Sequence, residues 1–192
     1  MGKFAFCSIV RKIIGQSLTS LKDDNIKTRE TDQDTIWHKG FYTYSQEWQP
    51  IYEKFIREFI STLFDEPFFY QKIPTFRVQC PGNLAVGEYH RDSQYGHPQG
   101  EVNFWLPLTP VTESSTVQIE GYPAICHTGT MVVFDAVNKL HGNILNSEQR
   151  SRVSVDFRIL PVSRYNATWP SRSINMKMAF RPGEYYAKHS VC

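Results

Sequence analysis

One run, RVSVDFRIL at residues 152–160, limits the possible folds of this chain more than any other stretch. Its polar side chains are Arg152, Ser154, Asp156 and Arg158, and they alternate with Val153, Val155, Phe157 and Ile159. Successive side chains of a β-strand point to opposite faces of the sheet, so the run predicts a strand with one polar and one apolar face. We expect the apolar face to pack against a layer of helices. The polar face would then line the interior of a barrel, and a polar interior indicates a bound ligand.

Other runs of strand length share the same half of the chain. They are residues 73–80, 84–89, 101–108, 116–119 and 130–134, and Pro, Gly and Asn residues separate them. No helical pattern lies between these runs, which favours an antiparallel sandwich or barrel. Before them, residues 48–64 place apolar side chains at spacings of three and four, which predicts an amphipathic helix with Pro50 in its first turn. We expect this helix to back the sheet.

Composition narrows the class of protein. A chain of 192 residues fits one domain, and 41% hydrophobic residues indicate a folded globular protein. The net charge of +2 and the lack of a Lys/Arg-rich run argue against nucleic acid or a membrane surface as a partner. The four cysteines are far apart and form no C-x-x-C pair, which predicts free thiols in a reducing compartment, the cytoplasm. The sequence gives no indication of oligomeric state.

The first 35 residues contain two features of their own. The N-terminal apolar run is broken by Arg11 and Lys12 and lacks a cleavage site, so we expect a first strand or amphipathic turn rather than a signal peptide. Residues 19–35 are polar and charged, and we expect an exposed loop that could close over a site. No apolar stretch has the length of a membrane span.

Metal-ligating side chains occur in a suggestive order. His90 and Asp92 lie two positions apart at the expected end of a strand, and His141 follows Asp92 by 49 residues, at the expected start of another. Two imidazoles and one carboxylate form the facial triad of non-haem iron sites, which leaves open positions on the metal. Arg152 follows His141 by 11 residues. Each element alone is an ordinary strand feature, but their order and spacing together indicate a candidate metal site.

These motifs resemble those of a known family. The set His90-x-Asp92, His141 and Arg152-x-Ser154 is similar to the signature of the Fe(II)/2-oxoglutarate-dependent oxygenases. Residues 74–158 resemble more narrowly the subgroup named after streptomycin biosynthesis, through PTFRVQCPGN, GEYHRDSQYGH, EVNFWLPLT, HGN and SRVSVDFR. Residues 182–186, PGEYY, resemble it more weakly, and the first 45 residues do not.

The resemblance implies a mainly β fold with flanking helices, the double-stranded β-helix, also called a jelly-roll or cupin-like fold. The single domain would comprise a helical or irregular part at about residues 1–70, a core at about 71–162 and a C-terminal extension at 163–192. It also implies that His90, Asp92 and His141 bind Fe(II). The cosubstrate 2-oxoglutarate would occupy two metal positions and O2 the third, with Arg152 and Ser154 holding the distant carboxylate.

The implied reaction couples oxidative decarboxylation of 2-oxoglutarate to succinate with oxidation of a C–H bond. Related halogenases lack the carboxylate ligand, so Asp92 favours hydroxylation. The subgroup suggests a small polar metabolite as substrate, such as an amino acid, amino sugar or aminocyclitol. Two alternatives are a non-catalytic jelly-roll protein that binds a ligand and a metal-cupin enzyme that does not use 2-oxoglutarate.

Several further residues are candidates for cavity roles, each with a structural alternative. Gln79 and Asn103 could contact 2-oxoglutarate. Substrate contacts could come from Arg77, Tyr95, Trp105 and Arg158. Trp105 could instead pack in the core, and Arg158 could instead be an ion-pair partner. We interpret His97 as a loop histidine rather than a ligand, because the triad is complete without it.

Overall fold

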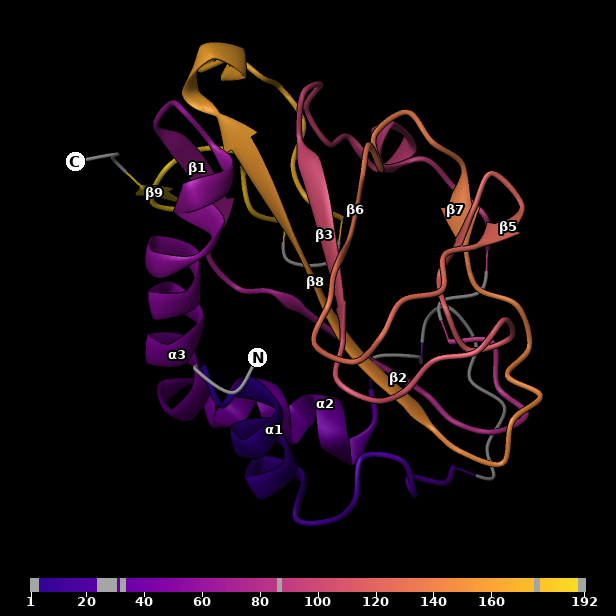
Figure 1. Ribbon diagram of the computed structural model, residues 1–192. Coiled ribbons are helices and arrows are strands. Elements are labelled where there is room, and N and C mark those ends of the chain that lie inside the picture. Colours follow the sequence, from indigo (N-terminus) through magenta and orange to yellow (C-terminus); the bar gives the residue numbers. More distant parts are fainter. Residues whose placement is uncertain (1–3, 24–30, 32–33, 86–87, 175–176, 190–192) are drawn as a thin grey trace.

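The computed structural model describes residues 4–23, 31, 34–85, 88–174 and 177–189. The helices are α1 (Phe6–Ile14), α2 (Ile36–Thr43), α3 (Ser45–Glu58) and the 3-10 helices η1 (Ile60–Leu63), η2 (Asp92–Tyr95) and η3 (Val162–Arg164). The strands are β1 (Phe68–Gln71), β2 (Thr75–Gln79), β3 (Val102–Pro107), β4 (Gln118–Ile119), β5 (Tyr122–Pro123), β6 (Val132–Phe134), β7 (His141–Gly142), β8 (Arg152–Pro161) and β9 (Tyr186–His189). The three α-helices lie on one side of the long strand β8, and β5 and β7 lie on the other (Figure 1).

The strands form two antiparallel sheets, so the fold is mainly β as predicted. The larger sheet has the order β6-β3-β8-β1-β9, with β2 also paired to β8, and the smaller sheet has the order β5-β4-β7. Strand β8 pairs with three others, β1, β2 and β3, and it is buried along its whole length. Arg152 lies opposite Gln79, and Arg158 lies opposite Asn103. The predicted run is therefore the central strand of the sheet.

The apolar face of β8 packs against the helices, as its alternation predicted. Val153, Val155, Phe157 and Ile159 share one buried cluster with side chains from α1, α2 and α3. Helix α3 contributes Trp48, whose ring stacks on Phe41 of α2 at 4.7 Å between centroids and whose Nε1 donates to the Phe41 carbonyl at 2.7 Å. Burying such side chains stabilises the fold by about 1.5–3 kcal/mol each. The helical layer thus covers the apolar face of β8 and leaves its polar face on the other side of the sheet.

The helices differ from the predictions in three ways. The N-terminal apolar run is helix α1, with Phe6 and Val10 buried one turn apart and Gly15 ending it at a φ of 76°, so the expectation of a strand or turn was wrong. Helix α2 was not predicted; its first turn is capped by Thr35, whose hydroxyl accepts from His38 N. Helix α3 begins at Ser45, which places Pro50 inside it rather than in its first turn, and it ends at Glu58 before η1.

The strands are shorter than the apolar runs. In the run 84–89, residues 84, 85, 88 and 89 form no strand, which corrects that prediction, and residues 86 and 87 lie outside the described part. The runs 116–119 and 130–134 pair only at Gln118–Ile119 and Val132–Phe134. Strands β1, β5 and β9 were not predicted. Strand β9, from the predicted C-terminal extension, adds to the larger sheet beside β1.

The polar segment after α1 begins against the sheet. Ser151 Oγ donates to the Leu18 carbonyl at 2.8 Å and accepts from Leu21 N at 3.0 Å, and both leucines are buried. Residues 24–30 and 32–33 lie outside the described residues, so closure of this loop over a site stays a prediction.

Two further predictions concern thiols and membrane spans. Cys7, Cys80 and Cys126 are free thiols, as predicted, and Cys192 lies outside the described residues. In the described part of the chain, every helix is too short or too polar to cross a membrane.

Candidate metal site and its cavity

His90 and His141 face each other across an antiparallel bridge. Each backbone N–H donates to the carbonyl of the other residue at 2.9 Å, and His141 begins strand β7 as predicted. The two imidazole centroids lie 4.4 Å apart. The pairing of backbones thus brings together two histidines that are 51 residues apart in the sequence.

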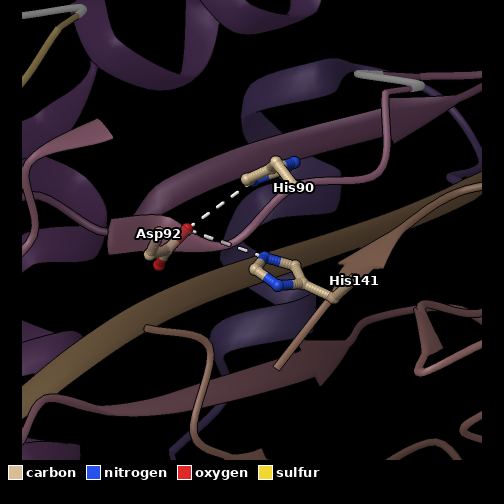
Figure 2. Close-up of side chains that lie close together, drawn as sticks. All are labelled: His90, Asp92 and His141. Carbon is tan, nitrogen blue, oxygen red and sulfur yellow. Dashed lines mark ion pairs between the residues drawn. The ribbon is translucent and has the colours of Figure 1, made fainter. Parts of the chain in front are cut away.

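Asp92 reaches the same point from the first turn of η2, not from a strand. Its backbone N–H donates to the Ala136 carbonyl at 2.9 Å, which fixes the turn against the loop before β7. Asp92 Oδ1 lies 3.6 Å from Nε2 of each histidine (Figure 2). The structure therefore brings together the three residues of the predicted triad, with ligand atoms within 4.8 Å of one another.

Both imidazoles are oriented by backbone carbonyls. His90 Nδ1 donates to the Glu88 carbonyl at 2.8 Å, and His141 Nδ1 donates to the Lys139 carbonyl at 2.9 Å. A carbonyl can only accept, so each Nδ1 holds a proton, and Nε2 is the ring nitrogen directed toward Asp92. Burial lowers the pKa of His141, and the Asp92 carboxylate only partly offsets this. His141 is therefore a neutral imidazole at neutral pH, the form that binds metal.

The other oxygen of Asp92 contacts Arg158. Arg158 Nε and Nη2 donate to Asp92 Oδ2 at 2.9 and 2.8 Å. Burial alone would raise the pKa of the Asp92 carboxyl, but the Arg158 guanidinium and the neighbouring histidines together outweigh burial. The pKa of Asp92 thus lies well below its usual range, and the side chain is a carboxylate at neutral pH.

A cavity opens beside the two histidines, between the two sheets. Its walls come from strands of the larger sheet and from the segment around β7. The lining residues are Arg77, His90, Asn103, Trp105, Val117, Phe134, His141, Gly142, Asn143, Arg152, Asp156 and Arg158. Three polar side chains of β8 line this cavity, Arg152, Asp156 and Arg158, which confirms that the polar face of the strand points into the interior.

Arg152 is held at one end of the cavity by four acceptors. Its Nε donates to the Ser115 carbonyl at 2.9 Å and its Nη1 to Ser154 Oγ at 2.9 Å. Its Nη2 donates to Gln79 Oε1 at 3.1 Å and to Asn143 Oδ1 at 2.8 Å. The residue is 1% exposed, so the guanidinium is a pre-oriented cation in a cavity wall. Such a planar fork suits a carboxylate group.

The other predicted residues have distinct surroundings. Gln79 is engaged by protein at both ends of its amide, since Nε2 donates to the Ile144 carbonyl at 2.7 Å, so it supports Arg152. Trp105 lines the cavity and also packs in a buried cluster, with the Arg152 guanidinium 5.7 Å from its ring. Among the described residues, Asn103 Oδ1 is a buried acceptor in the cavity wall that has no partner.

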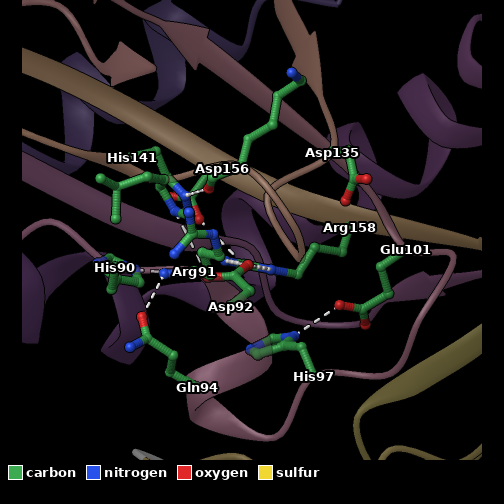
Figure 3. A network of polar contacts seen from close by, with 12 residues as sticks. His90, Arg91, Asp92, Gln94, His97, Glu101, Asp135, His141, Asp156 and Arg158 are labelled. Carbon is green, nitrogen blue, oxygen red and sulfur yellow. Dashed lines mark hydrogen bonds and ion pairs between the residues drawn. The ribbon is translucent and has the colours of Figure 1, made fainter. Parts of the chain in front are cut away.

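The loop after Asp92 contributes aromatic and acid–base contacts. Tyr95 packs edge-on against the His90 ring at 4.8 Å, which places it beside a metal ligand. His97 is no member of the triad; its Nδ1 lies 2.7 Å from Glu101 Oε2, and Tyr186 donates to the other Glu101 oxygen. The predicted loop histidine thus joins Glu101 and Tyr186 in a network between the loop after η2 and strand β9. Figure 3 shows the contact of His97 with Glu101.

The sequence reasoning missed three side chains of the site. Asp156 bonds to Arg158 and Arg77, Gln71 bonds to Arg158, and Asn143 bonds to Arg152. The alternation of residues 152–160 had already placed Asp156 on the inward face, but its contacts with the two arginines were not predicted. Asn143 lies two residues after His141, so the same rule points to it. Nothing in the sequence around Gln71 signals its contact.

The donor set of the triad fits a divalent first-row metal such as Fe(II). Two imidazole nitrogens and one carboxylate oxygen are the ligands of non-haem iron sites, and the three ligand atoms lie within 4.8 Å of one another. The carbonyls behind both Nδ1 atoms are the outer partners that metal-binding histidines usually have. Fold and site together define a mainly β protein with a candidate two-histidine, one-carboxylate metal centre.

Comparison with known proteins shows the family of the chain. The chain is 39% identical over 180 residues to the streptomycin biosynthesis protein StrG of Streptomyces griseus, covering 93% of this chain and 89% of that protein. It therefore belongs to the StrG family. No protein-family model matches the chain.

Two solved structures align with most of this chain. The structure of ThoJ, described as a non-heme monooxygenase, aligns with a TM-score of 0.51 at 9% identity over 81% of this chain and 77% of that one. AviO1 from Streptomyces viridochromogenes Tue57 aligns with a TM-score of 0.48 at 14% identity over 86% and 87% of the two chains. At 9% identity, the similarity to ThoJ concerns the fold alone.

Proposed function

We propose that this protein is an Fe(II)- and 2-oxoglutarate-dependent oxygenase that hydroxylates, or similarly oxidises, a small polar metabolite. The observation that carries the proposal is the convergence of His90 Nε2, His141 Nε2 and Asp92 Oδ1 at the wall of a cavity that also contains Arg152. Membership of the StrG family supports a role in biosynthesis. The description of ThoJ as a non-heme monooxygenase agrees with the proposed chemistry.

The fold that we propose is a double-stranded β-helix. Two antiparallel sheets enclose the cavity, with β3, β6 and β8 on one side and β7 on the other. In this fold, the metal-binding residues are expected near one open end of the barrel, where strands meet loops. His90, Asp92 and His141 occupy such positions. This arrangement supports the jelly-roll assignment.

Each residue of the site has a defined task in this proposal. His90, His141 and Asp92 hold Fe(II), and the two carbonyl-bound Nδ1 atoms keep both imidazoles in the binding tautomer. Arg152 binds the carboxylate of 2-oxoglutarate that lies away from the metal, with Ser154 orienting the guanidinium. When bound, Fe(II) supplies the redox chemistry that splits O2, with one oxygen atom entering succinate and the other the product while CO2 is released.

The remaining lining residues bound the substrate space. Asn103 presents an amide whose oxygen has no partner among the described residues, so it can accept a hydrogen bond from a bound molecule. Val117, Phe134 and Trp105 supply apolar walls that limit the water around the metal. A cavity with charged groups at both ends and apolar walls between them suits a compact, polar substrate.

The test measures Fe(II)-dependent conversion of 2-oxoglutarate to succinate under air, with and without a panel of amino acids, amino sugars and aminocyclitols. We expect succinate formation that depends on iron and rises with one class of the panel. His141→Ala should abolish it, whereas His127→Ala, a change at an exposed histidine outside the cavity, should not. Metal binding without any 2-oxoglutarate turnover would refute the proposal and favour a ligand-binding protein or another metal-cupin enzyme.

A further inference from the structure

Arg158 contacts the metal triad without belonging to it. It is 7% exposed and lies on the inward face of β8, opposite Asn103 of β3. Both Nε and Nη2 donate to a single atom, Asp92 Oδ2, at 2.9 and 2.8 Å, and Nη1 donates to Asp156 Oδ2 at 3.1 Å and Gln71 Oε1 at 3.2 Å (Figure 3). All three guanidinium nitrogens are therefore engaged by acceptors of the protein.

These contacts treat the two oxygens of Asp92 differently. Oδ2 accepts two charge-assisted hydrogen bonds, while Oδ1 lies 3.6 Å from both histidine Nε2 atoms. We propose that Arg158 is a positioning residue that makes Asp92 a single-oxygen ligand, by holding Oδ2 away from the metal. The proposal rests on the proposed metal site and assigns Arg158 to the ion-pair role rather than to substrate binding.

The physical need for such a residue follows from carboxylate geometry. The terminal torsion of an aspartate is soft and nearly two-fold, so an unrestrained carboxylate can present either oxygen or both. A carboxylate that chelates with both oxygens fills one more metal position. The proposed reaction needs three positions free, two for 2-oxoglutarate and one for O2. Fixing Oδ2 keeps the third position open before any ligand arrives.

Arg158 is itself fixed from two sides. Asp156 bonds to Arg158 through Oδ2 and to Arg77 Nε through Oδ1 at 3.1 Å, so charges alternate along Asp92, Arg158, Asp156 and Arg77. Gln71 is held on β1 by a bond from its Nε2 to the Ile73 carbonyl at 2.7 Å. A guanidinium restrained in this way offers two donors in one plane, which a lysine ammonium cannot do.

The test compares Arg158→Gln with Arg152→Gln, which removes another buried arginine from the same face of the same strand but makes no contact with Asp92. Apo protein without 2-oxoglutarate is titrated with Co(II), and the visible absorption reports affinity and coordination number. Loss of an outer partner typically weakens metal binding about 10–100-fold. We expect that loss in Arg158→Gln, with weaker absorption from a more highly coordinated ion, and no change in Arg152→Gln.

Arg158→Lys covers the case in which Arg158→Gln does not fold, as judged by circular dichroism. It keeps the charge but not the two coplanar donors, so we expect a folded protein with the same spectral change and a smaller loss of Co(II) affinity. Folded Arg158 variants with the wild-type spectrum and affinity would overturn the proposal. These spectra decide the role of Arg158 even if the wild-type protein binds Co(II) and never converts 2-oxoglutarate, a result that refutes the proposed reaction alone.

Discussion

Replacing Arg152 by leucine should separate cosubstrate binding from metal binding. Leucine removes the charge and all guanidinium donors from a site that is 1% exposed in the native protein. If 2-oxoglutarate receives one charge-assisted hydrogen bond from Arg152, at about 1.5–3 kcal/mol, the variant loses roughly that much binding energy. Since each 1.4 kcal/mol is about tenfold, the dissociation constant should rise by about 10–100-fold.

The same change also affects stability, and the structure indicates by how much. The Ser115 carbonyl, Gln79 Oε1 and Asn143 Oδ1 lose their donor. A buried polar group left unpaired costs about 1–3 kcal/mol, and water from the cavity can satisfy part of this, so we expect about 3 kcal/mol less stability toward urea. The metal ligands make no hydrogen bond to Arg152, so Ni(II) binding should be unchanged.

The assay is calorimetric titration of Ni(II)-loaded protein with 2-oxoglutarate. Arg152→Lys serves as a matched variant that keeps the charge but not the planar fork, and it should fall between wild type and Arg152→Leu. A folded Arg152→Leu protein that binds 2-oxoglutarate within about threefold of wild type would refute the assignment, since threefold is only about 0.6 kcal/mol. It would favour a metal-cupin enzyme that does not use 2-oxoglutarate.

Three further predictions test the core and the site. Trp48→Ala should lower the free energy of unfolding by about 3–5 kcal/mol in urea denaturation, because it removes a fully buried ring and its hydrogen bond. Gly142→Ala should weaken Co(II) binding, because the new Cβ would lie 3.1 Å from Tyr89 Cα, beside the metal ligand His141. Unchanged Co(II) affinity would contradict this, since it would mean that the backbone shifts without disturbing the site. In metal-free protein, the pKa of Asp92 lies below its ordinary value of 3.8. The ionised carboxylate therefore stabilises the folded protein above that pH. This stabilisation is lost as the pH falls through the lower pKa of Asp92 in the folded protein. Urea denaturation between about pH 2 and 6 should show that component in wild type and lack it in Asp92→Asn.

The sequence predicted the interior of the protein better than its edges. Strict alternation identified β8 and the direction of Arg152, because one face of that strand packs against the apolar helical layer and the other lines a polar cavity. The triad could be predicted because histidine and aspartate are typical metal ligands and lie at the expected ends of strands. Strand β9 pairs with β1 more than 110 residues away, and no local pattern encodes such a contact. Helix α2 is only eight residues long, so its periodicity barely completes two turns.

The role of Arg158 shows a different limit. Alternation correctly placed it inside, but the choice between a substrate contact and an ion pair depends on which acceptors other segments deliver. Asp92 comes from η2 and Gln71 from β1. Those encounters are set by the fold as a whole, so residue type and spacing alone could not decide between the two roles.

The two-faced character of β8 has a consequence for how the chain finds its pairing. A slip of one residue against β2 or β3 would move Arg152, Ser154, Asp156 and Arg158 into the apolar layer under the helices. It would also turn the apolar side chains of β8 toward the charged cavity. Both errors carry large penalties, so misaligned pairings should be short-lived during folding. The polar residues of β8 that serve the proposed chemistry therefore also specify the register of the sheet. An apolar substitution at one of them would weaken the preference for the correct register as well as impair function.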